Sequence, residues 1–308
     1  MVQGGDEEML ASPVNGNNGN NGNNGNNGND AGSDGFATLE SGSGFVGRLA
    51  SPYTSGAMIS SYDGIVGPWT DPIHQPSEGP ADIASNMARW SPRVRAHVID
   101  FDVIGKLRFY SNSRNDRNDV GVKIKHAEGW IRPNPDTGMP EIAYGQIVKL
   151  ERPTPETFRT KQLPYVRAYA DLRRDRASEI LSQLSGIVDF FGALGYLHRE
   201  RTRWTLELIS VLQRACVIAE MRMKHSMACR RPLEYSAQVQ PMIQTPGHGT
   251  FPSGHAAESF MIAHVLSVLF AEREAAIYGS DNRIWRRQLL RQAARIAVNR
   301  VVAGVHFP

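Results

Sequence analysis

The sequence is poor in cysteine, with only Cys216 and Cys229 among its 308 residues. Two thiols argue against a disulfide framework and exclude a metal site built from four thiolates. Both cysteines fall in a stretch with helical periodicity, so we expect them to be unpaired core residues.

Segments that direct a chain to a membrane are also lacking. The first residues, MVQGGDEEML, are acidic where a secretory signal is basic, and no apolar run follows them. The longest apolar run, Ser259 to Ala271, has 13 residues and contains His264, whereas a spanning helix needs about 20. We therefore expect no membrane span, and a cytoplasmic location by default.

Lysine is scarce in the C-terminal half, where arginine replaces it. Residues 158–308 hold 21 basic and 12 acidic residues, and 19 of the basic ones are arginine; residues 1–157 hold 13 basic and 19 acidic residues. Since arginine makes forked contacts with oxyanions, the second half is the part expected to bind an anion. We find no basic stripe interleaved with aromatic residues, which argues against a nucleic-acid partner.

Composition divides the N-terminal half into two regions. Residues 1–45 contain Asn-Asn-Gly repeats that have nothing to bury, and we expect them to form a disordered tail. Residues 46–157 are rich in Pro, Gly and Asp, which predicts an irregular region with short strands. The strand candidates are HVIDFDVI (97–104) and IAYGQIVKL (142–150), and NPDTG (134–138) is a turn candidate between strands.

Residues 158–308 have helical periodicity instead. Apolar residues at three- and four-residue spacing predict four helices, which cover 169–194, 201–225, 253 to about 277, and about 284 to 302. Four consecutive amphipathic helices predict an all-α helical bundle, preceded by a loop-rich region with short β elements.

Three polar clusters lie at the predicted helix ends. Lys224 and Arg231-Pro232 stand seven residues apart, Pro-Ser-Gly-His occupies 252–255, and Arg300 precedes His306 by six residues. Each cluster alone has a plainer interpretation, as solvated surface, an ordinary helix start, helix-dipole compensation or a structural histidine. Together they predict one oxyanion site, because a helix N-terminus and several cations favour the same ligand.

The pattern K-x6-RP, PSGH and NR-x5-H resembles the signature of the type 2 phosphatidic acid phosphatase (PAP2) superfamily, over roughly residues 160–308. This superfamily includes soluble acid phosphatases, membrane lipid phosphatases and vanadium-dependent haloperoxidases. The first two motifs match fully, and Asn299 stands where serine is commoner. The family's aspartate, four residues after the last histidine, falls beyond Pro308, so we expect the helical core to be truncated at its C-terminus.

The resemblance implies a role for each residue. The oxygens of phosphate or vanadate would be bound by five residues, namely Lys224, Arg231, Ser253, Gly254 and Arg300. His306 would attach to the central atom, as the nucleophile toward phosphorus or the sole protein ligand of vanadium. His255 would be the acid or base.

Three functions remain open at this stage. His248, seven residues before His255, is similar to the bromoperoxidase arrangement, where chloroperoxidases have phenylalanine. This favours a haloperoxidase that uses vanadate, hydrogen peroxide and a halide, with bromide or iodide preferred to chloride. A soluble phosphatase and a non-catalytic oxyanion-binding bundle are the alternatives. An organic acceptor and a homo-oligomeric assembly also stay open.

Overall fold

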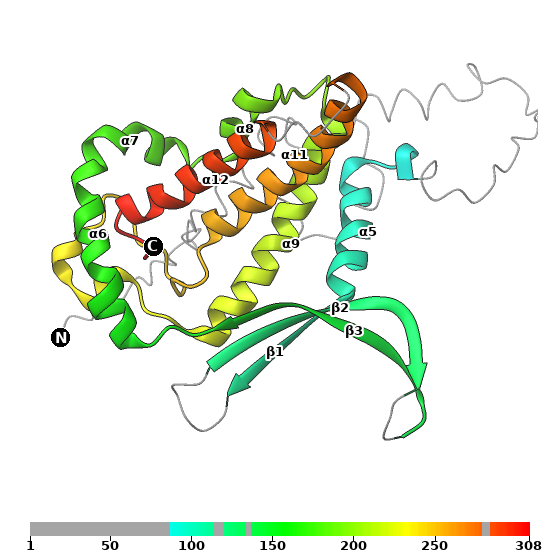
Figure 1. The fold of residues 1–308 in the computed structure, drawn as a ribbon, viewed down its shortest axis with the longest axis horizontal. Helices are drawn as coiled ribbons and strands as arrows, with labels where there is room; N and C mark the ends of the chain where they lie inside the picture. The colour runs from blue at the N-terminus through cyan, green and yellow to red at the C-terminus, as the bar shows by residue number, and fades with distance from the viewer. Residues whose placement is uncertain (1–86, 114–119, 134–136, 279–283) are drawn as a thin grey trace, which may run out of the picture. The chain divides into compact units, whose positions relative to one another are not determined.

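The computed structural model describes residues 87–113, 120–133, 137–278 and 284–308 (Figure 1). The chain divides into two compact units, one of residues 38–98 and one that contains residues 1–37 and 99–308. Since the described residues begin at 87, the predicted disorder of residues 1–45 lies outside them.

The larger unit is mostly helical, as predicted. Its helices are α6 (Leu163–Tyr169), α7 (Arg173–Ser182), α8 (Val188–Gly195), α9 (Arg203–Met227), α10 (Pro232–Tyr235), α11 (Gly254–Tyr278) and α12 (Ile284–Val302). Short helical turns at Thr157–Gln162, Ala170–Leu172 and Ala237–Val239 connect them.

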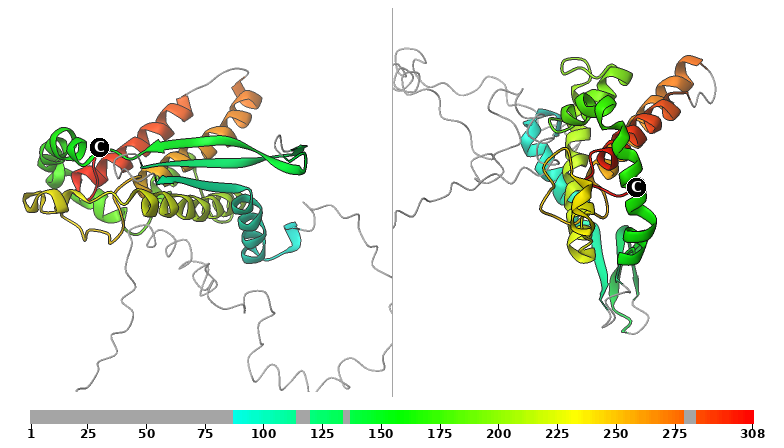
Figure 2. Two further views of the ribbon diagram at one scale, coloured as in Figure 1. Left: turned by 90° about the horizontal axis from the view of Figure 1, so that it is seen from below. Right: turned by 90° about the vertical axis from the view of Figure 1, so that its left-hand side faces the viewer.

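Helices α9, α11 and α12 lie side by side and enclose the main core (Figures 1 and 2). Their apolar stripes meet there, and α8 packs against the same cluster. The fully buried side chains include Ile209 of α9, Leu266 of α11 and Ile296 of α12. This packing fixes the C-terminal end of α9, the start of α11 and the end of α12, which carry the three motifs.

The region before the helical core contains one antiparallel sheet. It contains β1 (Leu107–Ser113), β2 (Val120–Pro133) and β3 (Pro140–Glu151) in the order β1-β2-β3. Val122 and Ile124 alternate toward the core, in a cluster with Met223 and Met227 of α9. The strand prediction for 142–150 is confirmed. Part of the predicted turn, residues 134–136, lies outside the described residues.

The strand prediction for 97–104 is wrong, because these residues belong to helix α5 (Pro92–Gly105). The β-branched residues of HVIDFDVI suggested a strand. Ser91-Pro92 is the signal that outweighs them: the Ser91 hydroxyl accepts from the N–H of Val94, and proline suits the first helical position.

The predicted helix 169–194 is also not continuous. It divides into Ala170–Leu172, α7 and α8, with a turn at residues 183–187 between the last two. Ser185 and Gly186 interrupt the helix there, since both residue types are weak helix formers. This turn faces the candidate site.

The prediction of no membrane-spanning length needs one correction. Among the described residues, α11 is long and apolar enough over Gly254–Ala271 to cross a membrane by length and composition alone. The sequence estimate started at Ser259 and so missed the first residues of this window. A core helix meets the same criterion, and 44% of the window is buried inside the protein.

Candidate anion-binding site

Lys224 comes from the last turn of α9 and points at the loop before α11. Ala228 ends the helix in a left-handed conformation, with its N–H donating to the Lys224 carbonyl. The Lys224 side chain is buried, and its ammonium donates to the carbonyl of Pro252. The loop approaches closely because Gly249 has no side chain: a Cβ there would lie 3.3 Å from the Lys224 carbonyl.

Arg231 sits at the centre of one side of the site. Its Nη1 donates to the Val305 carbonyl and to His306 Nε2, both at 2.8 Å. Its Nε donates to the His248 carbonyl at 2.9 Å, and its Nη2 donates to His248 Nδ1 at 3.0 Å. One guanidinium therefore holds the loop before α11 and the segment after α12 together.

The end of α12 carries Arg300 and His306 as one unit. The N–H groups of Val305 and His306 both donate to the Arg300 carbonyl, at 3.2 and 3.3 Å. The turn passes through Gly304 at φ +83°, a conformation that favours glycine. Arg173 of α7 also contacts this turn, donating from Nε to the Val302 carbonyl at 2.9 Å.

Ser253, Gly254 and His255 form the start of α11. Ser253 accepts the first helical bond, from the N–H of Ala257. The first turn contains no acidic residue, so the N–H groups and the positive end of the helix dipole are not offset by a carboxylate.

Arg300 and His255 meet a second side of the site, formed by α7 and the turn after it. Arg300 Nη2 donates to the Ile180 carbonyl at 3.1 Å and to Gln183 Oε1 at 2.8 Å. His255 Nε2 lies 3.3 Å from the Gln183 carbonyl. Because a carbonyl can only accept, His255 carries its proton on Nε2 in this contact.

Three buried cations converge here, and each has a depressed pKa. Burial is the main cause in all three: it lowers the pKa of Lys224 to about 8, and the pKa values of Arg231 and Arg300 to about 10. A bound anion would offset this cost, because it supplies the opposite charge that buried cations need.

The three histidines of the site are neutral near pH 7. Burial, followed by the nearby cations, lowers the pKa of His248 to about 4 and takes the pKa values of His255 and His306 well below their usual range. His306 donates from Nδ1 to the Thr250 hydroxyl at 3.3 Å and accepts from Arg231 at Nε2. Its Nε2 lone pair is therefore occupied by Arg231 Nη1, and it would become available only when Arg231 donates to a bound anion instead.

Buried donors without partners fit an oxyanion. Ser253 Oγ, Arg300 Nε and His248 Nε2 are buried and have no hydrogen-bond partner in the described part of the chain. Unpaired buried donors are costly, and one ligand rich in acceptor oxygens would satisfy them together. The residues present therefore fit phosphate or vanadate.

Sequence reasoning missed two buried acids beside Lys224. Glu220 of α9 and Glu258 of α11 are fully buried, and both raise the pKa of Lys224 against the effect of burial. Gln213 donates to Glu258 Oε2 at 3.0 Å. The sequence did contain a signal for these acids. Gln213, Glu220 and Lys224 recur at helical spacing, which places three polar residues on one buried face of α9.

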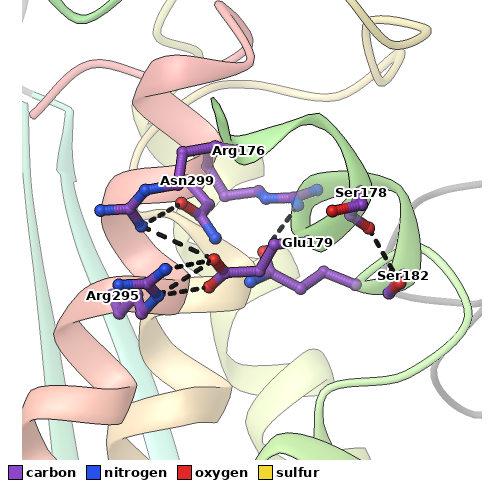
Figure 3. Close-up of polar contacts among 8 residues, drawn as sticks. Arg176, Ser178, Glu179, Ser182, Arg295 and Asn299 are labelled. Atoms are coloured by element: carbon purple, nitrogen blue, oxygen red, sulfur yellow. Dashed lines mark hydrogen bonds and ion pairs between the residues drawn. The ribbon is translucent and has the colours of Figure 1, made fainter. Parts of the chain in front are cut away.

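The sequence also did not predict a group of polar contacts that joins α7 to α12, the helix that carries Arg300. Glu179 of α7 accepts a bidentate ion pair from Arg295 of α12, with the Arg295 Nε and Nη2 atoms 2.8 Å from the two carboxylate oxygens (Figure 3). Arg176 donates to Asn299 Oδ1 at 3.2 Å. Asn299, which replaces the commoner serine, therefore ties α12 to α7.

An apolar cavity of about 520 Å³ borders Ser253 and Thr250. Its other walls are mostly aromatic and aliphatic, and they include Phe158, Phe251 and Phe260. Its size suits a small organic molecule.

The structure thus brings the predicted site residues together from four segments, while their chemical roles stay predictions. The proximity of these residues also affects the pKa of His306, which is lowered by burial and by the nearby groups Arg231, Lys224, His255 and Arg300. His248 contacts Arg231 rather than a distant surface. Cys216 and Cys229 are free, as expected, and Cys229 is buried while Cys216 is partly so. No group of histidine, cysteine or acidic residues able to hold a metal ion occurs in the described residues.

The helical region that carries the three motifs was compared with known protein families. Residues 204–308 match the family model of the PAP2 superfamily. No curated protein matches the chain. The family match covers the three motifs and supports membership of the PAP2 superfamily, a group usually of enzymes that includes phosphatases and haloperoxidases and does not by itself distinguish them.

Proposed function

We propose that this site holds orthovanadate and that the protein is a vanadium-dependent haloperoxidase, oxidising bromide or iodide with hydrogen peroxide to hypohalous acid. The observation that carries the proposal is Arg231, which donates to His306 Nε2 and to His248 Nδ1 through its two terminal nitrogens. A third histidine is thereby built into the anion site. Phosphoryl transfer requires only a nucleophile and an acid.

Each residue has a defined task in this proposal. His306 would ligate the metal through Nε2, while its Nδ1–H stays fixed on Thr250. Lys224, Arg231 and Arg300 would neutralise the anion, and Ser253 with the start of α11 would donate to its oxygens. Bound vanadate would supply the activation of hydrogen peroxide toward the halide.

His248 is the residue that would act on peroxide. Its Nδ1 lies 3.0 Å from Arg231 Nη2, a donor, and 3.2 Å from the Gly249 carbonyl, an acceptor, so the two contacts call for opposite tautomers. In the tautomer that accepts from Arg231, the neutral ring carries its proton on Nε2, a buried atom with no partner in the described residues. That N–H is a donor available to an incoming oxygen. Vanadate and hydrogen peroxide are accordingly the proposed cofactor and co-substrate, and a halide is the proposed reductant.

A soluble PAP2-type phosphatase is the second candidate, favoured by the electrostatic influence of His255 on His306 and by the apolar cavity at Ser253. His306 Nε2 would attack phosphorus, the bond from phosphorus to the ester oxygen would break, and His255 would protonate that oxygen. Water would then hydrolyse the phosphohistidine. A bound phosphate dianion would raise the pKa of His255 and so favour its acid form.

One set of assays separates these functions. Protein purified without phosphate is given orthovanadate, peroxide and bromide, and bromination of a phenol dye is followed. Hydrolysis of p-nitrophenyl phosphate is measured on the vanadate-free sample, since the apolar cavity can accommodate an aryl group. Exposed His264 provides the control variant His264→Ala. Bromination supports the first proposal, hydrolysis alone supports the second, and binding without turnover supports an oxyanion-binding bundle.

A further inference from the structure

We propose that Gln183 is a positioning residue of the anion site, which holds Arg300 in place through a neutral amide and so leaves the charge of Arg300 to the ligand. This inference rests on the proposed anion site. It adds a residue that lies outside the three motifs and outside the matched region 204–308.

The position of Gln183 comes from the break between α7 and α8. In a continuous helix, its carbonyl would accept from the N–H four residues later. Because the helix ends at Ser182, that carbonyl turns to His255 Nε2, at 3.3 Å. The side-chain Oε1 accepts from Arg300 Nη2 at 2.8 Å. One residue therefore contacts the cation and the histidine of this side.

Every partner of Arg300 that the structure gives is uncharged. Its Nη2 donates to the Ile180 carbonyl and to Gln183 Oε1, and burial alone lowers its pKa. An acid at position 183 would neutralise the guanidinium and compete with the ligand. Glutamine orients the guanidinium without that competition.

The other end of the Gln183 amide also lacks a partner. Gln183 is fully buried, and its Nε2 makes no hydrogen bond within the described residues. Arg300 Nε is in the same state. Two unpartnered donors on neighbouring groups point to a ligand rich in acceptors, which is independent support for an anion against this side.

The test compares Gln183→Glu with Gln183→Met, both of similar size to glutamine. Phosphate and orthovanadate affinities are measured by calorimetry at pH 8 and at pH 5, and melting of the free protein is followed. Gln288→Glu is the control, because it adds the same charge on an exposed position of α12. We expect Gln183→Met to weaken binding about tenfold through the lost hydrogen bond.

Gln183→Glu should weaken anion binding without lowering the melting temperature of the free protein. At pH 8 it should weaken anion binding by about 10²-fold relative to the wild type, as expected for a lost charge-assisted contact, while the free protein melts no lower than the wild type, since the new carboxylate pairs with Arg300. A similar loss is expected at pH 5, because pairing with Arg300 keeps the carboxylate ionised below its ordinary pKa of about 4.3.

Three results would overturn the inference. These are wild-type affinity in Gln183→Glu at pH 8, wild-type affinity in Gln183→Met, or weaker binding accompanied by a lower melting temperature, which is the signature of structural damage alone. Absence of binding by the wild-type protein would instead overturn the proposed anion site itself.

Discussion

The two sides of the site differ in how their cations are balanced. On the side of Lys224 and Arg231, the buried acid Glu220 raises the pKa of both cations, and Glu258 and Glu234 each add to one of them. On the side of Arg300, no acid among the described residues moderates the effect of burial, and the contacts are a backbone carbonyl and the amide of Gln183. Histidines lie on both sides, since His306 and His248 contact Arg231 on the first and His255 contacts Gln183 on the second.

This difference separates two demands that an anion site must meet. A protein has to fold before the ligand arrives, and buried charges without counterions oppose folding. The acids near Lys224 reduce that cost in the free protein. The side of Arg300 retains its full positive charge, which is then available to the ligand. We infer that the first side serves mainly stability and attachment, and that the second side serves mainly charge recognition.

The two histidines should give the largest contrast. His306→Ala should abolish tight orthovanadate binding and all turnover, because the attachment atom is lost. His255→Ala should keep vanadate bound, though more weakly, while turnover falls by about 10²–10⁴, the usual contribution of a positioned acid or base. Calorimetric vanadate titration and the bromination assay measure the two effects, with His264→Ala as the control. Equal loss of vanadate binding in both variants would contradict these assignments.

The two kinds of cation should differ in the free protein. Lys224→Met removes a buried cation that interacts with the buried acids Glu220 and Glu258 and should destabilise folding. The loss should stay below the roughly 3–5 kcal/mol of an uncompensated buried charge, because Glu220 also interacts with Arg231 and Gln213 donates to Glu258. Arg300→Met removes a buried charge that has no acidic partner, so it should cost far less or even stabilise the free protein. Both variants should bind phosphate poorly. Urea denaturation without ligand measures the stabilities, and similar losses in the two variants would remove the contrast drawn above.

Lys224 also predicts opposite pH trends for binding and stability. Its pKa in the folded protein is about 8, below its ordinary value of 10.5. Between these values the unfolded chain holds a proton that the folded chain has released, so stability should rise with pH. Phosphate affinity should fall across the same range as the ammonium loses its charge. Denaturation midpoints and phosphate titrations from pH 7 to 10.5 test this, with Lys161→Met as an exposed-lysine control. Parallel trends would refute the assignment.

The smallest effect is expected at His248, which touches Arg231 but is not proposed to touch the metal. His248→Phe should spare vanadate affinity to within a few-fold and change the halide preference or the pH optimum of bromination. The wild type should oxidise bromide and iodide and use chloride poorly. Rates with the three halides, measured over a pH series, test the prediction. Equal use of chloride and bromide by the wild type would remove the similarity to bromoperoxidases.

The sequence predicted the residues of the three motifs better than the residues that contact and position them. The periodicity of α9, α11 and α12 predicted their positions, because each has a long apolar stripe that must be buried. Helix α5 and the break after Ser182 were missed, since Ser91-Pro92 and Ser185-Gly186 are local signals that outweigh apolar pattern. The three motifs fixed which ends would carry polar groups.

The acids and Gln183 could not be predicted in the same way. Glu220 and Glu258 come from different helices, and only packing shows that both lie near Lys224. Gln183 lies in a short apolar segment with no motif around it. Its contacts with Arg300 and His255 span more than seventy residues of sequence in each case, a distance over which local pattern carries no information.

The closed turn after α12 has a consequence for how this site can vary. The Arg300 carbonyl accepts the N–H groups of Val305 and His306, and Gly304, which precedes both, supplies the left-handed bend. These backbone hydrogen bonds close a turn, and the closed turn fixes the number of residues between Arg300 and His306. Substitutions inside the turn can change its side chains, but an insertion or deletion of one residue would rotate His306 away from Arg231. Length, rather than composition, is the property that this segment cannot change.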